Sequence, residues 1–407
     1  MSFKHSDLSS LKNIFSSLKS KNYRLYFYGQ GISLIGTWIQ NIALSWLVYR
    51  LTGSVFMLGL VGFTTQIPTF ILTPFTGVVT DRYNRLKIMI WAQVLFMIHA
   101  FVMAFLVLNN MIEVWHIVAL SVIFGIINAF DAPARQSLVI DLIDDPKNLG
   151  NAIALNSAIF NGARLVGPAI GGMAIAVVGE GFCFLINAFS FVAVLVALFQ
   201  IKLSKRQIAP PDREFKKSFF EGLRYTFGTQ NIRDLILLLG VMSLAAFPYI
   251  VMLPAYAKEI LHGGSDTLGF LMSALGAGAL AGALYMASRK TTKGLENIIS
   301  TGVLLMSVAI ICTGISDSLY FSLFALCVGG LTMVLALSSI NTLLQTTTEE
   351  RMRGRVMSFY AMALMGTQPI GNLISGAAAS GIGIQWTMVI GGIVTFIAGV
   401  LWRGFLR

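Results

Sequence analysis

Twelve long apolar runs most constrain what this 407-residue chain can fold into. A helix needs about 20 consecutive, mostly apolar residues to cross a bilayer, and the runs are close to that length or longer. Only 12% of the residues are charged, against roughly 25% in an ordinary soluble domain, which excludes a water-soluble globule. We therefore predict an all-α membrane protein with twelve transmembrane helices. The runs cover residues 23–51, 55–80, 86–108, 115–143, 149–178, 181–203, 232–261, 268–288, 298–315, 319–347, 352–380 and 382–402.

The basic residues predict the orientation of these spans. If the N-terminus is cytoplasmic and the spans alternate, 25 of the 29 Lys and Arg residues fall on the inner side. Only Arg50 and Lys258 fall outside, and Arg135 and Arg164 lie within spans. This distribution follows the positive-inside rule and predicts a multi-pass membrane protein with both termini cytoplasmic. The net charge of +11 therefore faces the lipid bilayer, and we expect no nucleic-acid partner.

One polar stretch near the midpoint divides the spans six and six. We predict an N-terminal six-helix bundle with an amphipathic N-terminal segment (1–203), a cytoplasmic linker with an amphipathic helix (204–231), and a C-terminal six-helix bundle (232–407). The pair Leu58-Gly59 at the start of the second run has a counterpart, Leu268-Gly269, at the start of the eighth. Such repeats predict two pseudo-symmetric bundles, an arrangement in which secondary transporters bind cargo between the repeats.

The loop after the second run carries a motif. Gly77 is followed four residues later by Asp81 and Arg82, and then by Arg85, which resembles the signature loop of the major facilitator superfamily. An acid beside two arginines forms a charge-assisted latch that can open and close, here a cytoplasmic gate. Asp141, near the inner end of the fourth run, is a further candidate partner for Arg85. An ordinary positive-inside loop explains the arginines but not the glycine and the acid.

The fifth run carries a second motif, made of Gly and Pro. It resembles the motif of the exporter, or antiporter, branch of the same superfamily. Proline removes a helix hydrogen bond and glycine removes bulk, so such a helix bends and packs closely; the alternative is that both residues are simply common in membrane helices. With both motifs in one twelve-span chain, the sequence is identified as a member of the superfamily over essentially its full length. The motif residues are Gly162, Gly167, Pro168, Gly171 and Gly172.

Two segments, 36–40 and 131–136, are similar to a subgroup that contains bacterial siderophore exporters of the enterobactin-exporter type and macrolide efflux proteins. The resemblance implies a monomeric secondary transporter of the bacterial inner membrane. An enzyme is not expected, because the residues show no constellation of nucleophile, base or metal ligands. It would export a small amphipathic molecule, a siderophore or drug, by proton antiport and alternating access. The proton gradient would supply the energy, and no cofactor is expected. A lysophospholipid transporter of the same fold is the alternative.

Three ionisable residues lie inside predicted spans: Asp131, Arg135 and Arg164. Such residues are costly in a membrane and are functional candidates. Arg135 follows Asp131 by four residues and shares its helix face, while Arg164 lies at a similar depth on the next span. We predict that Asp131 is the protonatable residue and exchanges partners between the two arginines. A permanent ion pair that braces the bundle is the alternative. His99, within the third run, is a candidate proton relay or a packing residue.

The resemblance places the first, fourth, seventh and tenth runs around a central substrate cavity. Aromatic, methionine and amide side chains in these runs suit a bulky, partly apolar ligand, although helix packing also explains some of them. The four His and three Cys residues show no ligand spacing, so no metal site is predicted. The cavity candidates are Trp38, Gln40, Asn41, Tyr249, Met252 and Asn341.

Overall fold

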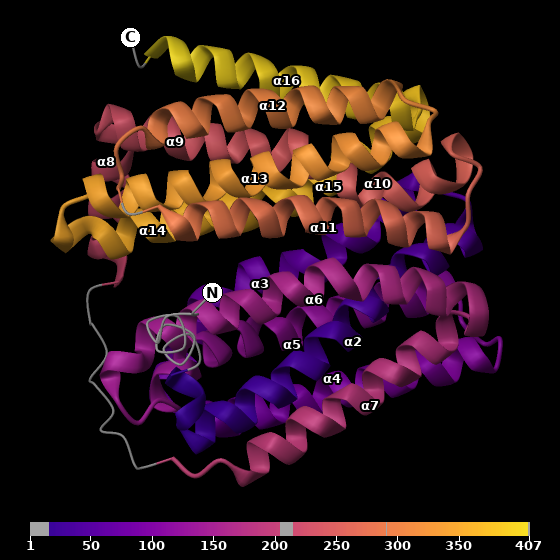
Figure 1. Ribbon diagram of the computed structural model, residues 1–407, viewed down its shortest axis with the longest axis horizontal. Helices are drawn as coiled ribbons and strands as arrows, with labels where there is room; N and C mark the ends of the chain where they lie inside the picture. The colour runs from indigo at the N-terminus through magenta and orange to yellow at the C-terminus, as the bar shows by residue number, and fades with distance from the viewer. Residues whose placement is uncertain (1–15, 204–214, 290, 406–407) are drawn as a thin grey trace, which may run out of the picture.

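The computed structural model describes residues 16–203, 215–289 and 291–405, and every regular element in these ranges is a helix. Figure 1 shows two groups of helices lying side by side, the N-terminal half starting in indigo and the C-terminal half running from rose through orange to yellow. In the described ranges, eleven helices are long and apolar enough to cross a membrane. The predicted all-α membrane fold is confirmed, and the predicted amphipathic segment at the N-terminus lies largely outside the described residues.

The N-terminal half follows the sequence prediction closely. A short 3-10 turn, η1 (Ser16–Lys19), leads into six helices, and a second, η2 (Pro146–Asn148), precedes the fifth of them. Ser54 caps the second helix by accepting from the backbone N–H of Met57, and Asn84 caps the third by accepting from that of Lys87, which satisfies donors that a helix start leaves unpaired. The six helices are α2 (Lys21–Thr52), α3 (Val55–Arg82), α4 (Arg85–Leu108), α5 (Val114–Asp141), α6 (Leu149–Val178) and α7 (Glu180–Gln200).

The C-terminal half begins with a linker helix and a composite seventh span. Pro248 and Pro254 lack the backbone N–H of a regular helix, and two π-helical turns, η3 and η4, lie beside them. The elements are α8 (Phe215–Gly228), α9 (Gln230–Val241), η3 (Met242–Ala246), α10 (Tyr249–Ala255), η4 (Tyr256–Ile260), α11 (Ser265–Ser288), α12 (Leu295–Ile315), α13 (Leu319–Thr347), α14 (Glu350–Met365), α15 (Thr367–Ile382) and α16 (Ile384–Phe405).

The eleventh predicted span is broken rather than continuous. It consists of α14 and α15, which meet at Gly366 and contain 16 residues each, so neither is among the eleven long apolar helices. Pro369 cannot donate to the carbonyl of Met365. At Gly366 an added Cβ would lie 2.5 Å from the ring of Phe70 on α3. The break therefore falls where the two halves of the protein touch.

The linker helix α8 is bound to the C-terminal half. Glu221 accepts hydrogen bonds from Arg351 and Arg355 of α14, each at 2.7 Å, and the ring of Phe227 packs edge-on against Phe359. An amphipathic helix was predicted in this stretch, and its described part packs against the predicted cytoplasmic end of α14.

The halves meet through two helix pairs, α3 with α15 and α6 with α11. A Cβ added at Gly172 would lie 2.8 Å from the Cα of Gly269, and one added at Gly376 would lie 3.0 Å from the Cα of Gly59. These close approaches need glycine because no side chain fits between the backbones. The glycines of the predicted repeat, Gly59 and Gly269, thus occupy corresponding positions at the two seams.

Most of these contacts lie toward one end of the helices, where α2 ends and α3 begins, which we call the outer end. There the Tyr49 hydroxyl of α2 donates a hydrogen bond to Glu259 of η4, and the Ser265 hydroxyl of α11 donates to the carbonyl of Gly172 at 3.1 Å. Further contacts reach mid-helix, at Gly366. The halves are therefore joined from the outer end to about the middle of the membrane.

Candidate functional site

Asp131 is a buried acid whose two carboxylate oxygens are both engaged. It is 3% exposed and lies on α5. Arg135 Nε is 3.4 Å from Oδ2, and Gln93 Nε2 of α4 donates to Oδ1 at 2.7 Å. The predicted pairing with Arg135 is formed because residues four apart share a helix face. Gln93, which the sequence analysis did not single out, holds the second oxygen.

A polar cavity adjoins this acid. Its volume is about 50 Å³, enough for a few water molecules, and Gln30, Ser33 and Thr37 of α2 line it together with Asp131 and Arg135. Among the described residues, the buried Gln30 Oε1 has no hydrogen-bond partner, so it can accept one from water. The Asp131 carboxylate therefore borders a space that can hold water.

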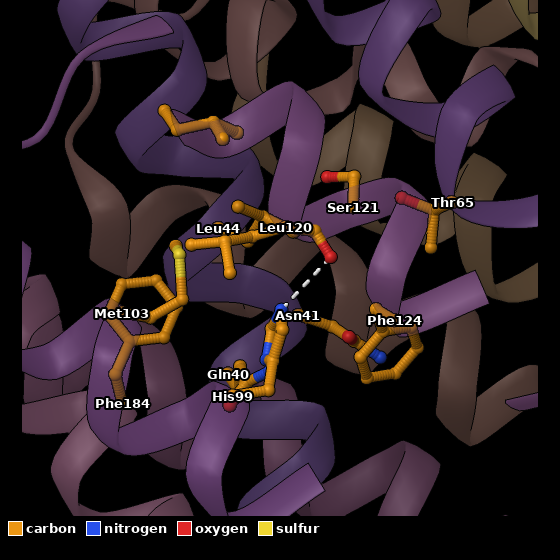
Figure 2. Close-up of a pocket in the computed structure, with 11 residues that line it drawn as sticks. Gln40, Asn41, Leu44, Thr65, His99, Met103, Leu120, Ser121, Phe124 and Phe184 are labelled. Atoms are coloured by element: carbon orange, nitrogen blue, oxygen red, sulfur yellow. Dashed lines mark hydrogen bonds between the residues drawn. The ribbon is translucent and has the colours of Figure 1, made fainter. Parts of the chain in front are cut away.

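A second, smaller cavity surrounds His99, as Figure 2 shows. It has a volume of about 20 Å³, room for one water molecule. His99 Nε2 lies 3.2 Å from the carbonyl oxygen of Leu120, so this nitrogen carries the proton and Nδ1 is the acceptor. Within the described part of the chain, Nδ1 and the hydroxyl of Ser121 have no partner. Phe124 borders both cavities, so its ring lies between the surroundings of Asp131 and those of His99.

Arg164 lies apart from Asp131, unlike the predicted shared network. Helix α2 packs against α6 over a wide area, whereas α5 and α6 barely touch, so the hairpin partners are separated. The side chain of Arg164 instead interacts electrostatically with the Tyr249 hydroxyl of α10, in the other half. The structure brings together Asp131 and Arg135 but places Arg164 at the seam between the halves.

One contact considered for the predicted gate, between Arg85 and Asp141, is formed. Arg85 Nη1 at the start of α4 lies 3.2 Å from Asp141 Oδ2 at the end of α5, and it donates to the carbonyl of Ser137 at 3.3 Å. This latch joins two helices of the N-terminal half. The other three motif residues belong to α3, but their surroundings fall outside what the structure describes. They are Gly77, Asp81 and Arg82.

The exporter motif faces α2 with two of its glycines. A Cβ at Gly167 would collide with the Cβ of Trp38, and one at Gly171 would lie 3.2 Å from the Cα of Ile39. At Gly162 an added Cβ would meet nothing within 4 Å. The close packing of α6 on α2 thus depends on Gly167 and Gly171 and not on Gly162.

The remaining motif residues face the other half. Besides the contact of Gly172 with Gly269, the carbonyl of Pro168 would lie 2.9 Å from a Cβ added at Gly269. The motif therefore allows one helix, α6, to pack closely on its own bundle and on the opposite bundle at once.

The predicted cavity residues divide into those that are partly exposed or lie at the seam and those that are buried inside one bundle. Trp38 is half-buried and packs edge-on against Phe160 of α6, with ring centroids 6.3 Å apart, while Asn41 is exposed and Tyr249 lies at the seam beside Arg164. Gln40, by contrast, is buried in the N-terminal bundle and accepts from Asn187 at 2.7 Å.

The other two cavity candidates are also engaged elsewhere. Met252 is buried at 3% exposure, and Asn341 hydrogen-bonds to Gln345 and to the hydroxyl of Tyr360. Helix packing thus accounts for Gln40 and Met252. Sequence reasoning also missed the bond between Tyr49 and Glu259, because each residue looked like an ordinary helix end.

This architecture, two helical halves meeting at glycine seams, is the fold of major facilitator transporters. Residues 12–405 match the model of the transmembrane secretion effector family, and the chain belongs to that family. Solved structures share the fold: an inward-facing bacterial homologue of the human lysosomal transporter Spinster (16% identity, TM-score 0.71, 94% of this chain and 96% of that one), and an inward-facing bacterial homologue of the iron transporter ferroportin (16%, TM-score 0.71, 94% and 98%).

Curated relatives include a siderophore transporter and two efflux proteins. The staphyloferrin A transporter of Staphylococcus aureus is 25% identical, over 91% of this chain and 93% of its own length. Macrolide efflux protein A of Streptococcus pyogenes is 22% identical, over 93% and 96%. The multidrug efflux pump Tap of Mycolicibacterium fortuitum is 24% identical, over 90% and 91%. The chain is therefore a multi-pass efflux transporter of the siderophore or drug type and not an enzyme.

Proposed function

We propose that this protein exports a siderophore or an amphipathic drug from the cytoplasm by proton antiport and alternating access. It acts as a monomer in the bacterial inner membrane, with both termini cytoplasmic and the proton gradient as its energy source. The observation that carries the proposal is the buried acid Asp131, held by Arg135 and Gln93 beside a polar cavity.

Protonation of Asp131 changes what the acid can hold. The carboxylate accepts from Gln93 and attracts Arg135, whereas the neutral acid has lost the charge that the guanidinium needs. Arg135 is 25% exposed, so once released it can turn toward water. The N-terminal half therefore has two arrangements that differ by one proton.

The closed outer end supports loading from the cytoplasm. The halves touch there through glycine seams, the bond between Tyr49 and Glu259 and the bond from Ser265. Backbones that meet across glycines carry no interlocking side chains, so these seams can separate as smooth surfaces. Alternating access then requires the outer contacts to break when cargo is released.

The test uses purified protein in liposomes with a pH-sensitive dye inside. Erythromycin and staphyloferrin A serve as probes, chosen because relatives transport a macrolide or staphyloferrin A. For the wild type, we expect movement of at least one probe to drive a counterflow of protons. Asp131→Asn should abolish the proton signal, while Asp266→Asn, which alters an exposed acid at the outer end of α11, should leave it intact. Normal proton counterflow in Asp131→Asn contradicts the coupling role, and transport of neither probe contradicts the cargo class.

A further inference from the structure

We propose that Arg164 is the anion-binding residue of the transport site, and that the exported cargo carries a carboxylate or phosphate group. The inference rests on the proposed export function and specifies the chemistry of its cargo. Arg164 lies 15 residues after Leu149 and 14 before Val178 in α6, which places its Cα about 20 Å from either end of the helix. The guanidinium therefore lies near the middle of the membrane.

The two arginines inside the spans differ in their partners. Arg135 pairs with Asp131, which offsets much of the cost of a charge in the membrane. For Arg164, the described residues provide no ion pair, and the titratable side chain that acts on it electrostatically is that of Tyr249. A half-buried cation that keeps its charge without a carboxylate is expensive. A ligand that brings its own negative charge supplies the missing partner.

The surroundings fit an anionic group attached to an apolar body. Phe160 precedes Arg164 by one helical turn and packs edge-on against Trp38, so aromatic surface lies on the same side of α6. Guanidinium donates in a planar fork that matches carboxylate or phosphate with two parallel hydrogen bonds. The aromatic rings offer contact area to the remainder of a partly apolar molecule.

The position of Arg164 at the seam links ligand binding to movement. Its backbone carbonyl would lie 2.8 Å from a Cβ added at Gly276 of α11, and Tyr249 also belongs to the C-terminal half. An anion bound between Arg164 and Tyr249 therefore touches both halves. Separation of the halves pulls these two groups apart and weakens the site, which favours release.

The test measures ligand binding to purified protein by tryptophan fluorescence and calorimetry. The anionic probes are citrate, a soluble carboxylate, and lysophosphatidylglycerol, a lipid phosphate. Their neutral counterparts are trimethyl citrate and monooleoylglycerol. We expect at least one anion to bind at least tenfold more tightly than its neutral counterpart. Preference for citrate identifies a soluble cargo, and preference for the lysolipid identifies a lipid cargo with the same recognition.

Three variants assign the binding to this side chain. Arg164→Gln should weaken anion binding at least tenfold, and Arg164→Lys should weaken it less because it keeps the charge without the fork. Arg403→Gln, an exposed arginine near the end of α16, should bind as the wild type does. The proposal is overturned if both Arg164 variants bind the anion with the affinity of the wild type. It is also overturned if the wild type binds anionic and neutral probes equally, or if it binds neither anion.

The coupling proposal can fail separately. Binding is measured without a proton gradient, so Asp131→Asn should bind the anion as the wild type does. If Asp131→Asn keeps proton counterflow but the Arg164 variants lose the anion, antiport through Asp131 is wrong and the anion site stands. If the Arg164 variants bind the anion normally while Asp131→Asn loses proton counterflow, the anion site is wrong and antiport through Asp131 stands.

Discussion

The two halves share a fold but differ in the chemistry they bury. In the N-terminal half, Asp131, Arg135, Arg164 and His99 all lie well inside helices, and the two cavities described above are there. In the described C-terminal half, charged residues lie near helix ends. Among the described residues of this half, the buried Ser, Thr, Asn and Gln side chains are all hydroxyls except Asn372, and several bond to carbonyls of their own helices, such as Ser307 with Val303 at 2.8 Å, Thr313 with Ala309 at 2.9 Å and Thr332 with Val328 at 2.8 Å.

This difference indicates a division of work. A hydroxyl that bonds within its own helix does not change charge near neutral pH. A buried acid with a movable partner, by contrast, has a charged and a neutral state. The N-terminal half can therefore respond to protons, and the C-terminal half can act as the neutral surface against which it moves. We therefore predict that energy coupling belongs to the N-terminal half, and three sets of substitutions test the difference between the halves.

The largest effect is expected from breaking the buried ion pair. Arg135→Gln leaves Asp131 with Gln93 alone and an uncompensated charge. For a buried pair this costs about 3 to 5 kcal/mol, and we expect about 3 because Arg135 is 25% exposed. The measurement is the free energy of unfolding in detergent. The double variant Asp131→Asn with Arg135→Gln should recover most of the loss, since neither charge remains.

The matched control is an ion pair of the other half. Arg351 bonds to Glu221, but its side chain is 77% exposed, so Arg351→Gln should cost about 1 kcal/mol or less. A cost for Arg351→Gln similar to that for Arg135→Gln would remove the energetic distinction between the halves.

The second prediction concerns the surface along which the halves move. Gly172→Leu places a side chain against the backbone of α11, where even a Cβ would lie 2.6 Å from the Ser265 carbonyl. Overpacking of this kind costs about 1 to 3 kcal/mol and should hold the outer end apart, so that efflux from liposomes falls at least tenfold. Gly162→Leu, in the same motif but with open space around it, should transport normally. Equal loss in both variants would mean that the motif acts through its own helix and not through the seam.

The sequence predicted local relations better than tertiary ones. Hydropathy predicted the spans, and the four-residue spacing predicted the pairing of Asp131 with Arg135, because both depend on neighbours along one helix. The position of Arg164 could not be predicted from depth alone, since it depends on α6 packing on α2 rather than on α5. Likewise, the Leu58-Gly59 repeat indicated symmetry, but the partner of Gly59 on α15 is a contact between distant segments.

The broken eleventh span shows the same limit. Hydropathy indicated one run over 352–380, and Pro369 was present in it, yet proline is tolerated in many membrane helices. The close approach of Phe70 to Gly366 comes from the opposite half of the protein. No local pattern carries that information.

The smallest effect is expected at a buried amide side chain. Among the described residues of the C-terminal half, Asn372 is the one buried Asn or Gln, whereas the other buried polar side chains carry hydroxyls. Asn372 of α15 is 1% exposed and faces α3, where a Cβ at Gly62 would lie 3.0 Å from Nδ2. Among the described residues, neither polar atom of the Asn372 amide has a hydrogen-bond partner. Leucine has a similar shape and no polar atoms, so Asn372→Leu removes an unpaired amide whose burial costs about 1 to 3 kcal/mol.

Because this amide is buried only while the outer end is closed, Asn372→Leu should stabilise the closed form by about 1 kcal/mol. The expected result is a higher melting temperature and efflux that slows by a few-fold, since opening now exposes an apolar group. Asn187→Leu is the counterpart in the N-terminal half. Its amide bonds to Gln40 at 2.7 Å and to Ser190 at 2.9 Å, so the substitution leaves both without that partner and should lower the melting temperature. If both variants shift the melting temperature in the same direction, the buried amides of the two halves are equivalent, and Asn372 does not destabilise the closed outer seam.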